Sequence, residues 1–313
     1  MGLTAWARVA IANRLKRFTR HQIRTTLTDV LPQLLQYHHS ADEERLSYHE
    51  HIKDPSRKTL RDRLEAAGVA VEDAEFDVED FHRWLARWPQ LTRYYTGGWA
   101  IEKCLEHYLA YRALRPSRGE VYVDVGAARS PFAPILRKEG VRAYRLDRLH
   151  RPGIHGMNIG ADAAHTGLRD GFASAVSAQD AYSLFAADTD ILFVREAVRI
   201  LNDEGRFVVV PLFLAEQYIN ILDPWSDLRS VAIDPGAKRV WRDNPQDIAF
   251  ARHYSPESFH DRVWTRIPET MTSRVLYFGN VLELRHRYPE QHIYAFFLLY
   301  SEKRSRGGRR VAV

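Results

Sequence analysis

The stretch VYVDVGAARSPF, residues 121–132, decides the fold of this chain. An apolar run that reads as a buried strand contains Asp124 and ends at Gly126. Two small residues, Ala127 and Ala128, follow before a Ser-Pro helix start. Glycine adopts backbone conformations that side chains forbid, so a ligand can approach the main chain closely at such a turn. The pattern favours a strand-to-helix loop that holds a cofactor, although it is not the G-x-G-x-x-G of dinucleotide sites.

Strands and helices alternate outward from this stretch. The predicted strands cover residues 120–126, 141–147, 154–159, 172–179 and 206–213, and the helices between them cover 131–140 and 189–205. This alternation predicts an α/β fold with a doubly wound, mostly parallel sheet. Two more strands, 273–284 and 293–303, are separated by so few residues that they must form an antiparallel pair.

The flanking segments divide the chain further. Residues 1–116 predict a helical N-terminal extension that acts as a cap, residues 117–303 the α/β domain, and residues 304–313 a disordered basic tail. Residues 1–36 have the pattern of a basic amphipathic helix, which either packs on the domain or makes a peripheral membrane contact. An insertion at 214–254, between two strands of the sheet, is expected to lie on the substrate side, with a structural loop as the alternative.

Charge and composition exclude several classes of protein. The net charge of +5 comes from the two ends, because residues 1–40 and 303–313 each carry an excess of five positive charges and the body is acidic. A nucleic-acid partner is therefore disfavoured. The single cysteine, Cys104, excludes a disulfide within the chain and a multi-cysteine zinc site, and no metal site is predicted. No apolar run reaches the length of a membrane span, so we expect a cytoplasmic protein, with peripheral contact at the inner membrane face as the variant.

Two further acids follow the first loop at successive strand ends. Asp147 comes 23 residues after Asp124, where an acidic side chain can accept hydrogen bonds from both hydroxyls of a ribose. Asp162 follows the next strand. Aspartates are common in turns, but three in this order favour a ligand site over ordinary turn residues.

Residues 119–213 resemble the class I S-adenosylmethionine-dependent methyltransferases. VYVDVGAA is similar to their first motif, REAVRILNDEGRFVVVPLF to the segment around their fifth strand, and RHYSPESFHDRV (252–263) to the segment before their final strand pair. The resemblance implies a seven-stranded sheet of order 3-2-1-4-5-7-6 with the last strand pair antiparallel, and S-adenosyl-L-methionine as cofactor. It implies that Gly126 and Ala127 meet the methionine part. The cofactor-binding residues so predicted are Asp124, Gly126, Ala127, Ala128, Asp147, Asp162, Ala163 and Ser177.

The implied reaction is methylation of an oxygen in a small polar or saccharide acceptor. A hydroxyl acceptor needs a base, and the candidates are His155, Asp180 and His253. Departures from the family pattern at Ala128, Ala173 and NDEG leave open a catalytically inactive relative that serves as a binding or scaffold subunit. An RNA methyltransferase that uses the basic ends as arms is the second alternative.

Overall fold

The computed structural model describes residues 57–226, 228, 231–242 and 248–304. It also describes Leu31 and Leu34, both helical, and the two-residue strand β1 (Arg45–Leu46). Apart from these two leucines, the predicted amphipathic helix over 1–36 lies outside the described residues. The predicted tail does too, apart from Arg304.

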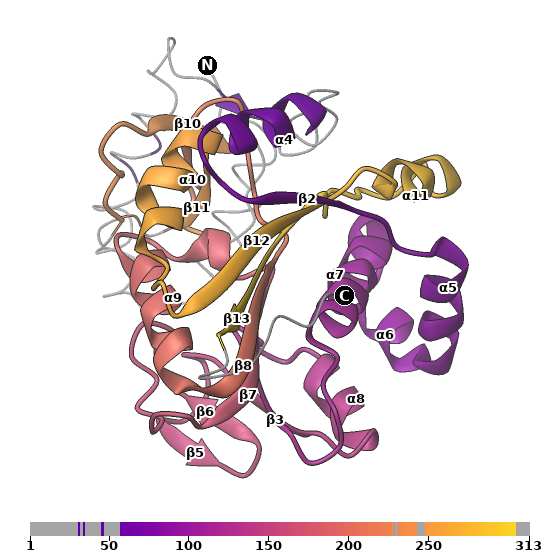
Figure 1. Cartoon of the computed structure of the whole chain (residues 1–313). Helices are drawn as coiled ribbons and strands as arrows, with labels where there is room; N and C mark the ends of the chain where they lie inside the picture. The colour runs from indigo at the N-terminus through magenta and orange to yellow at the C-terminus, as the bar shows by residue number, and fades with distance from the viewer. Residues whose placement is uncertain are drawn as a thin grey trace.

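A nine-stranded sheet forms the centre of the molecule (Figure 1). Seven of its strands follow the predicted order, running β6-β4-β3-β7-β8-β13-β12. The first five are mutually parallel, and β13 is antiparallel to both of its neighbours. This confirms the predicted topology. The bounds are β3 (Val121–Val125), β4 (Arg142–Leu146), β6 (Asn158–Gly160), β7 (Ala173–Gln179), β8 (Leu201–Val210), β12 (Met271–Phe278) and β13 (Phe297–Lys303).

Two edge strands extend this sheet beyond the prediction. β2 (Val71–Ala74) comes from the N-terminal extension and pairs in parallel with β12. At the other edge, the single strand predicted over 154–159 is a hairpin of β5 (Gly153–His155) and β6. The chain reverses there because Gly156 adopts a left-handed φ of 61°, a conformation that glycine tolerates.

Helices cover both faces of the sheet (Figure 1). Helices α7 and α8 lie on one face, and α9 lies on the other with α10 on the same side. Ser255 caps α10 by accepting a hydrogen bond from the Ser258 amide. The helices are α4 (Arg57–Ala66), α5 (Val78–Arg87), α6 (Pro89–Tyr94), α7 (Ala100–Leu114), α8 (Phe132–Lys138), α9 (Thr189–Ile200), α10 (Pro256–Arg262) and α11 (Val281–Arg287). The short 3₁₀ turns are η1 (Gly97–Trp99), η2 (Tyr182–Leu184) and η3 (Trp264–Arg266).

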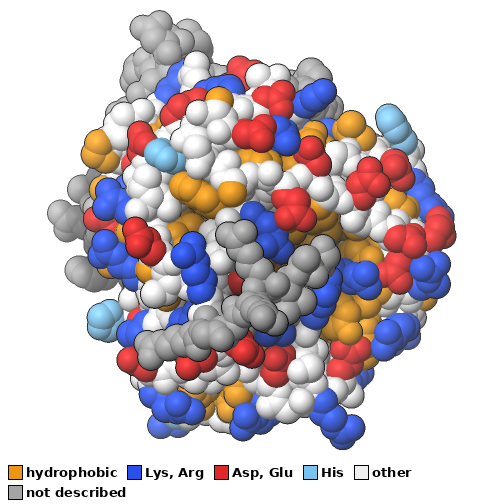
Figure 2. Space-filling model, viewed as in Figure 1, with side chains coloured by type: hydrophobic (Ala, Val, Ile, Leu, Met, Phe, Trp, Pro, Cys, Tyr) orange, Lys and Arg blue, Asp and Glu red, His pale blue; other side chains and the backbone are white. Residues whose placement is uncertain are grey.

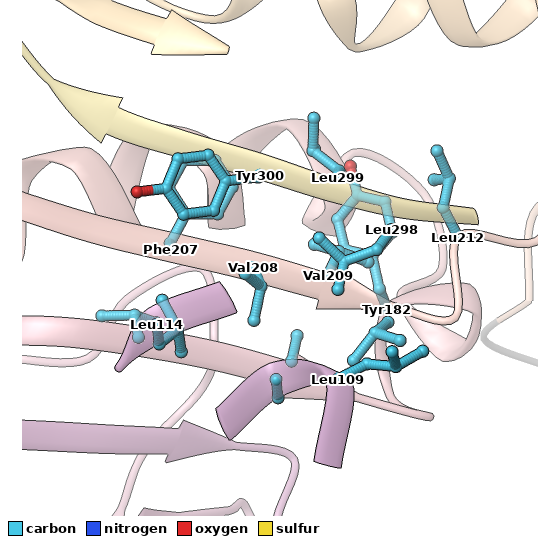
Figure 3. Close-up of a cluster of buried hydrophobic side chains, with 14 of the residues drawn as sticks. Leu109, Leu114, Tyr182, Phe207, Val208, Val209, Leu212, Leu298, Leu299 and Tyr300 are labelled. Atoms are coloured by element: carbon cyan, nitrogen blue, oxygen red, sulfur yellow. The ribbon is translucent and has the colours of Figure 1, made fainter. Parts of the chain in front are cut away.

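Helix α7 packs across the middle of the sheet. Its Leu109 and Leu114 lie on the face of the sheet that carries Val208 of β8 and Leu298 of β13 (Figure 3). Each such buried side chain contributes about 1.5–3 kcal/mol through the hydrophobic effect. The packing fixes the start of α7 beside the carboxyl ends of the central strands.

Two predicted elements end earlier than expected. The helix predicted over 189–205 stops at Ile200, and β8 already begins at Leu201. The strand predicted over 273–284 stops at Phe278, because the Gly279-Asn280 turn leads into α11. That helix buries Val281 and Leu284 at helical spacing, a period that an apolar run this short does not distinguish from a strand.

The insertion folds as a small second sheet of order β1-β10-β9-β11. Its strands are β9 (Ile219–Leu222), β10 (Lys238–Arg242) and β11 (Phe250–His253). Ile221, Val240 and Ala251 form a core of their own there. The insertion is therefore a built substructure and not a loop.

On the face shown in Figure 2, acidic and basic side chains are interspersed. Within the described part of the chain, no helix is long and apolar enough to cross a membrane.

Candidate functional site

The carboxyl ends of β3, β4 and β7 meet at one edge of the sheet, and the loop after β3 crosses this edge. The Gly126 amide donates to the Leu146 carbonyl at 2.9 Å, which ties the loop to β4. Gly126 has a φ of 71°, and a Cβ there would lie 2.3 Å from the Cβ of Ala181. Only glycine fits this turn, because the chain after β7 passes so close to it.

A cavity of about 320 Å³ opens beside this loop, and we call it the strand-end cavity. Asp147 and Asp162 line it together with Gly126 and Ala163. Its other wall is the segment after β7, which contributes Asp180, Ala181, Leu184, Phe185, Ala186 and Thr189. Asp147 and Asp162 thus face a wall that is apolar apart from Asp180 and Thr189.

The two acids are held by backbone amides. Asp147 accepts from the Ala128 amide at 2.8 Å through Oδ2 and from the Leu149 amide at 2.9 Å through Oδ1. Asp162 accepts from the Ala164 amide at 2.8 Å and lies 3.8 Å from the Arg148 guanidinium. A carboxylate oxygen has two lone pairs, so both side chains keep acceptor capacity towards the cavity.

A second cavity of about 380 Å³, the inner cavity, continues from Gly126 towards α7. It brings Asp124, Ala127 and Ala128 together with residues of the N-terminal extension. Those residues are Tyr94, Tyr95, Trp99, Lys103, Glu106 and His107. The first loop thus joins the two cavities.

Asp124 anchors a buried hydrogen-bond network at the floor of the inner cavity. Its Oδ1 accepts from Ser177 Oγ at 2.8 Å and from Gln179 Nε2 at 3.1 Å. Burial raises the pKa of Asp124 to about 7, although these two hydrogen bonds oppose the rise. Ser177 is fully buried beneath Asp124 and is not among the residues that line the cavities. Its predicted contact with a cofactor therefore stays a prediction.

His107 of α7 extends the same network. Its Nδ1 lies 2.5 Å from Gln179 Oε1 and its Nε2 lies 2.8 Å from the Tyr95 hydroxyl. The ring stacks on Phe132 at 4.6 Å between centroids. Burial lowers the pKa of His107 to about 4, so the neutral imidazole is favoured.

A third cavity of about 370 Å³, the insertion-side cavity, lies between α7 and the small sheet. Trp99, Lys103 and Tyr294 line it with Asp180. Its remaining lining residues are Ser183, Leu184, Arg242, Ile248 and Ala251. Asp180 is the one described residue that lines all three cavities.

Asp180 follows β7 directly and adopts a left-handed φ of 50°, which aspartate tolerates better than most residues. Its Oδ2 lies 2.6 Å from Lys103 Nζ. Lys103 also donates to Glu106 Oε1 at 2.8 Å and to the Tyr294 hydroxyl at 3.0 Å. Burial alone would lower the pKa of Lys103, but Asp180 and Glu106 together raise it, so the ammonium stays charged.

Two glutamates of α7 lie beside this lysine. Glu102 and Glu106 are both fully buried. Burial raises the pKa of Glu102 to about 7 and that of Glu106 well above its ordinary value. Glu102 Oε2 accepts from the Tyr294 amide at 2.9 Å, which fixes the segment before β13 against α7.

The two histidines proposed as bases lie elsewhere. His155 is exposed on the edge strand β5, with Nε2 2.9 Å from the Pro152 carbonyl. His253 is buried on β11 and stacks on Phe213 at 4.7 Å. Neither is among the lining residues of the three cavities. Of the three candidate bases, Asp180 alone lies at the junction.

Sequence reasoning missed the charged residues of α7. The N-terminal extension was expected to act as a cap, but Lys103, Glu106 and His107 were not singled out. The available signal was four polar residues at 102, 103, 106 and 107 inside an otherwise apolar helix. Such residues at i and i+4 share one face, and here that face is buried.

No family model and no curated protein matches the chain. Many solved structures do. One is a Burkholderia thailandensis 1,6-didemethyltoxoflavin-N1-methyltransferase with bound S-adenosylhomocysteine, at 10% identity and a TM-score of 0.42 over 80% of this chain and 91% of that one. Another is the Haloferax volcanii complex of the Trm112 activator and a putative methyltransferase, at 14% identity and a TM-score of 0.43 over 74% and 99%. A Mesorhizobium loti S-adenosylmethionine-dependent methyltransferase matches at 16% identity and a TM-score of 0.40 over 64% and 98%.

Similarity at this level says nothing about activity, and the strand order is what identifies the fold. The fold is a Rossmann-like α/β fold, consistent with that expected from the resemblance to the class I methyltransferases. In this sheet, β13 lies between β8 and β12 and is antiparallel to both. This feature distinguishes the fold from the all-parallel doubly wound sheets.

Proposed function

We propose that this chain is an S-adenosylmethionine-dependent methyltransferase that methylates an oxygen of a small polar acceptor. The observation that carries the proposal is the place of Asp180, whose carboxylate lines all three cavities. A carboxylate at that junction would be close both to a cofactor in the strand-end and inner cavities and to an acceptor in the insertion-side cavity.

The residues present fit the cofactor. In the strand-end cavity, Asp147 would accept the ribose hydroxyls, and Asp162 and Ala163 would meet the adenine. The inner cavity, which Gly126, Ala127 and Lys103 line, would hold the methionine part. The cofactor supplies a methyl group activated on a sulfonium, and the narrow passage at Gly126 and Asp180 is where that centre would lie.

Asp180 is then the proposed base. Its Oδ2 is bonded to Lys103, and no hydrogen bond from the described residues reaches Oδ1. A hydroxyl in the insertion-side cavity could donate its proton to Oδ1 as its oxygen forms the new bond to carbon. The remaining contribution of the chain is alignment, since an in-line displacement depends mainly on geometry.

The insertion-side cavity supports a small, ring-shaped acceptor. Trp99 and Tyr294 stand 5.6 Å apart at 71°, and polar side chains surround them. Aromatic faces beside hydrogen-bonding groups suit a saccharide or another polar ring. A cytoplasmic location, and a peripheral membrane contact by residues 1–36, belong to the proposal as well.

Calorimetric titration with S-adenosylmethionine and S-adenosylhomocysteine tests the cofactor assignment. We expect micromolar binding by the wild type, and about a hundredfold weaker binding by Asp147→Ala, because two charge-assisted hydrogen bonds are lost. Asp170→Ala is the matched control, since Asp170 is an exposed aspartate paired with Arg199 on the surface. Its affinity should equal that of the wild type.

Absence of binding by a folded wild type would overturn the proposal. It would favour instead a methyltransferase-fold protein that serves as a binding or scaffold subunit. RNA affinity that falls steeply with salt would favour the RNA alternative. Cofactor binding, in contrast, justifies a screen of hydroxyl acceptors by mass spectrometry, in which the product is heavier by one methylene.

A further inference from the structure

The segment between η2 and α9, residues 185–188, forms a wall of the strand-end cavity. Phe185 and Ala186 line this cavity, and the preceding Leu184 lines the insertion-side cavity too. Ala187 has a left-handed φ of 50°, which costs free energy for a residue with a Cβ. Contacts from residues outside 185–188 must therefore stabilise this conformation.

Arg252 of β11 reaches this segment from the insertion. Its Nη1 donates to the Phe185 carbonyl at 2.5 Å and its Nη2 to the Ala187 carbonyl at 2.8 Å. The same guanidinium forms a fork with Asp234 at 2.7 and 2.8 Å and lies 3.0 Å from Asp190 at the start of α9. The side chain is fully buried, so all of these bonds are made away from water.

A second arginine completes the contact. Arg262 of α10 binds Asp190 at 2.8 and 2.9 Å and also donates to the Ala187 carbonyl. Tyr254 donates to Asp190 at 2.5 Å. The two guanidinium groups thus face two buried carboxylates, those of Asp190 and Asp234, and Arg262 also pairs with the exposed Asp188 at 3.3 Å. Buried ion pairs are retained where the geometry and the hydrogen bonds are this complete.

We propose that Arg252 is a positioning residue for the cofactor cavity, through which the insertion holds the wall at 185–188. The inference rests on the proposed function, because it assigns adenosine to the strand-end cavity. Ala251, the neighbour of Arg252 on β11, lines the insertion-side cavity. One strand therefore supports both cavities, and acceptor and cofactor sites share a wall whose position depends on it.

Titration with adenosine and with S-adenosylhomocysteine tests this role. Arg252→Lys cannot keep the fork to Asp234 and both carbonyl bonds, so we expect the affinity for each probe to fall by about tenfold. Arg262 also donates to the Ala187 carbonyl and is less buried than Arg252. Arg262→Lys therefore replaces Arg252→Lys in this test if the latter does not fold. Arg206→Lys is the control, because Arg206 donates to the carbonyls of Leu114 and Arg115 far from the cavities.

Amide hydrogen exchange separates this inference from the proposed function. We expect faster exchange in residues 184–190 of Arg252→Lys than in the same peptide of Arg206→Lys, whether or not a cofactor binds. If the wild type binds neither adenosine nor S-adenosylhomocysteine, the proposed function is overturned. The hydrogen-exchange comparison still tests the positioning role in that case. Unchanged exchange in 184–190, or an adenosine affinity equal to that of the control, would overturn the positioning role.

Discussion

The carboxylates on the two sides of the candidate site differ in their exposure and in the groups that surround them. On the sheet side, Asp147 and Asp162 stand at strand ends, partly exposed and held by backbone amides. On the helix side, Glu102 and Glu106 of α7 are fully buried next to Lys103. Asp147 and Asp162 can accept hydrogen bonds from a ligand. Glu102 and Glu106 instead stabilise the positive charge of Lys103.

This difference follows from where each pair of acids lies in the fold. The strand-end acids belong to the fold, because a parallel sheet places successive loops at one edge. The acids of α7 belong to a helix that precedes the central strands, and one of them, Glu106, is joined to Asp180 through Lys103. Asp180 is the residue at which the two sides meet.

The largest expected effect comes from Asp180→Asn. Loss of the base should lower kcat by about a thousandfold on the acceptor that a screen identifies. The affinity for S-adenosylhomocysteine should stay within about threefold of that of the wild type, because Asn keeps the shape of the side chain. Asp170→Asn is the control. Full activity of Asp180→Asn would show that Asp180 is not the base.

The next effect is a pH dependence of stability that arises on the helix side. The pKa of Glu102 is about 7 in the folded chain, above the usual value for an exposed glutamate. Between about pH 4.5 and 7 the folded state keeps a proton that the unfolded state has lost. The contribution of Glu102 to the free energy of unfolding therefore falls as pH rises through this window, by about 1.4 kcal/mol per pH unit, and levels off above it.

Glu102→Gln resembles the protonated glutamate and should remove the contribution of this one proton from the pH dependence of stability. Urea unfolding at pH 5, 6 and 7 measures it, with a difference from the wild type of about 3 kcal/mol at most. Glu283→Gln, on the exposed face of α11, should leave the slope unchanged. An equal slope in wild type and Glu102→Gln would mean that the proton is held elsewhere in the α7 cluster.

The same contrast explains what the sequence could predict. The strand-end residues 124–128, 147 and 162 were predictable because strand periodicity and small-residue turns are local signals. Helix α7 was predictable as a helix. The role of its charged residues was not, because most of the helix is buried and its polar positions do not mark a solvent-exposed face. The small sheet was not predictable, because β10 pairs with β1, far away in the sequence. Arg252 gave no local signal, since its partners come from residues 185, 187, 190 and 234.

The smallest expected effect is the coupling between Lys103 and Asp180. Their side chains are 18% and 39% exposed, so water screens the pair only in part. A double-mutant cycle of Lys103→Gln and Asp180→Asn, measured by urea unfolding, should give a coupling of about 1 kcal/mol. The control cycle on Arg199 and Asp170, whose side chains are 36% and 83% exposed, should give less than about 0.5 kcal/mol. Equal couplings in the two cycles would mean that Lys103 and Asp180 interact only as an ordinary surface pair. The helix side would then contribute charge to the site without holding Asp180 in position.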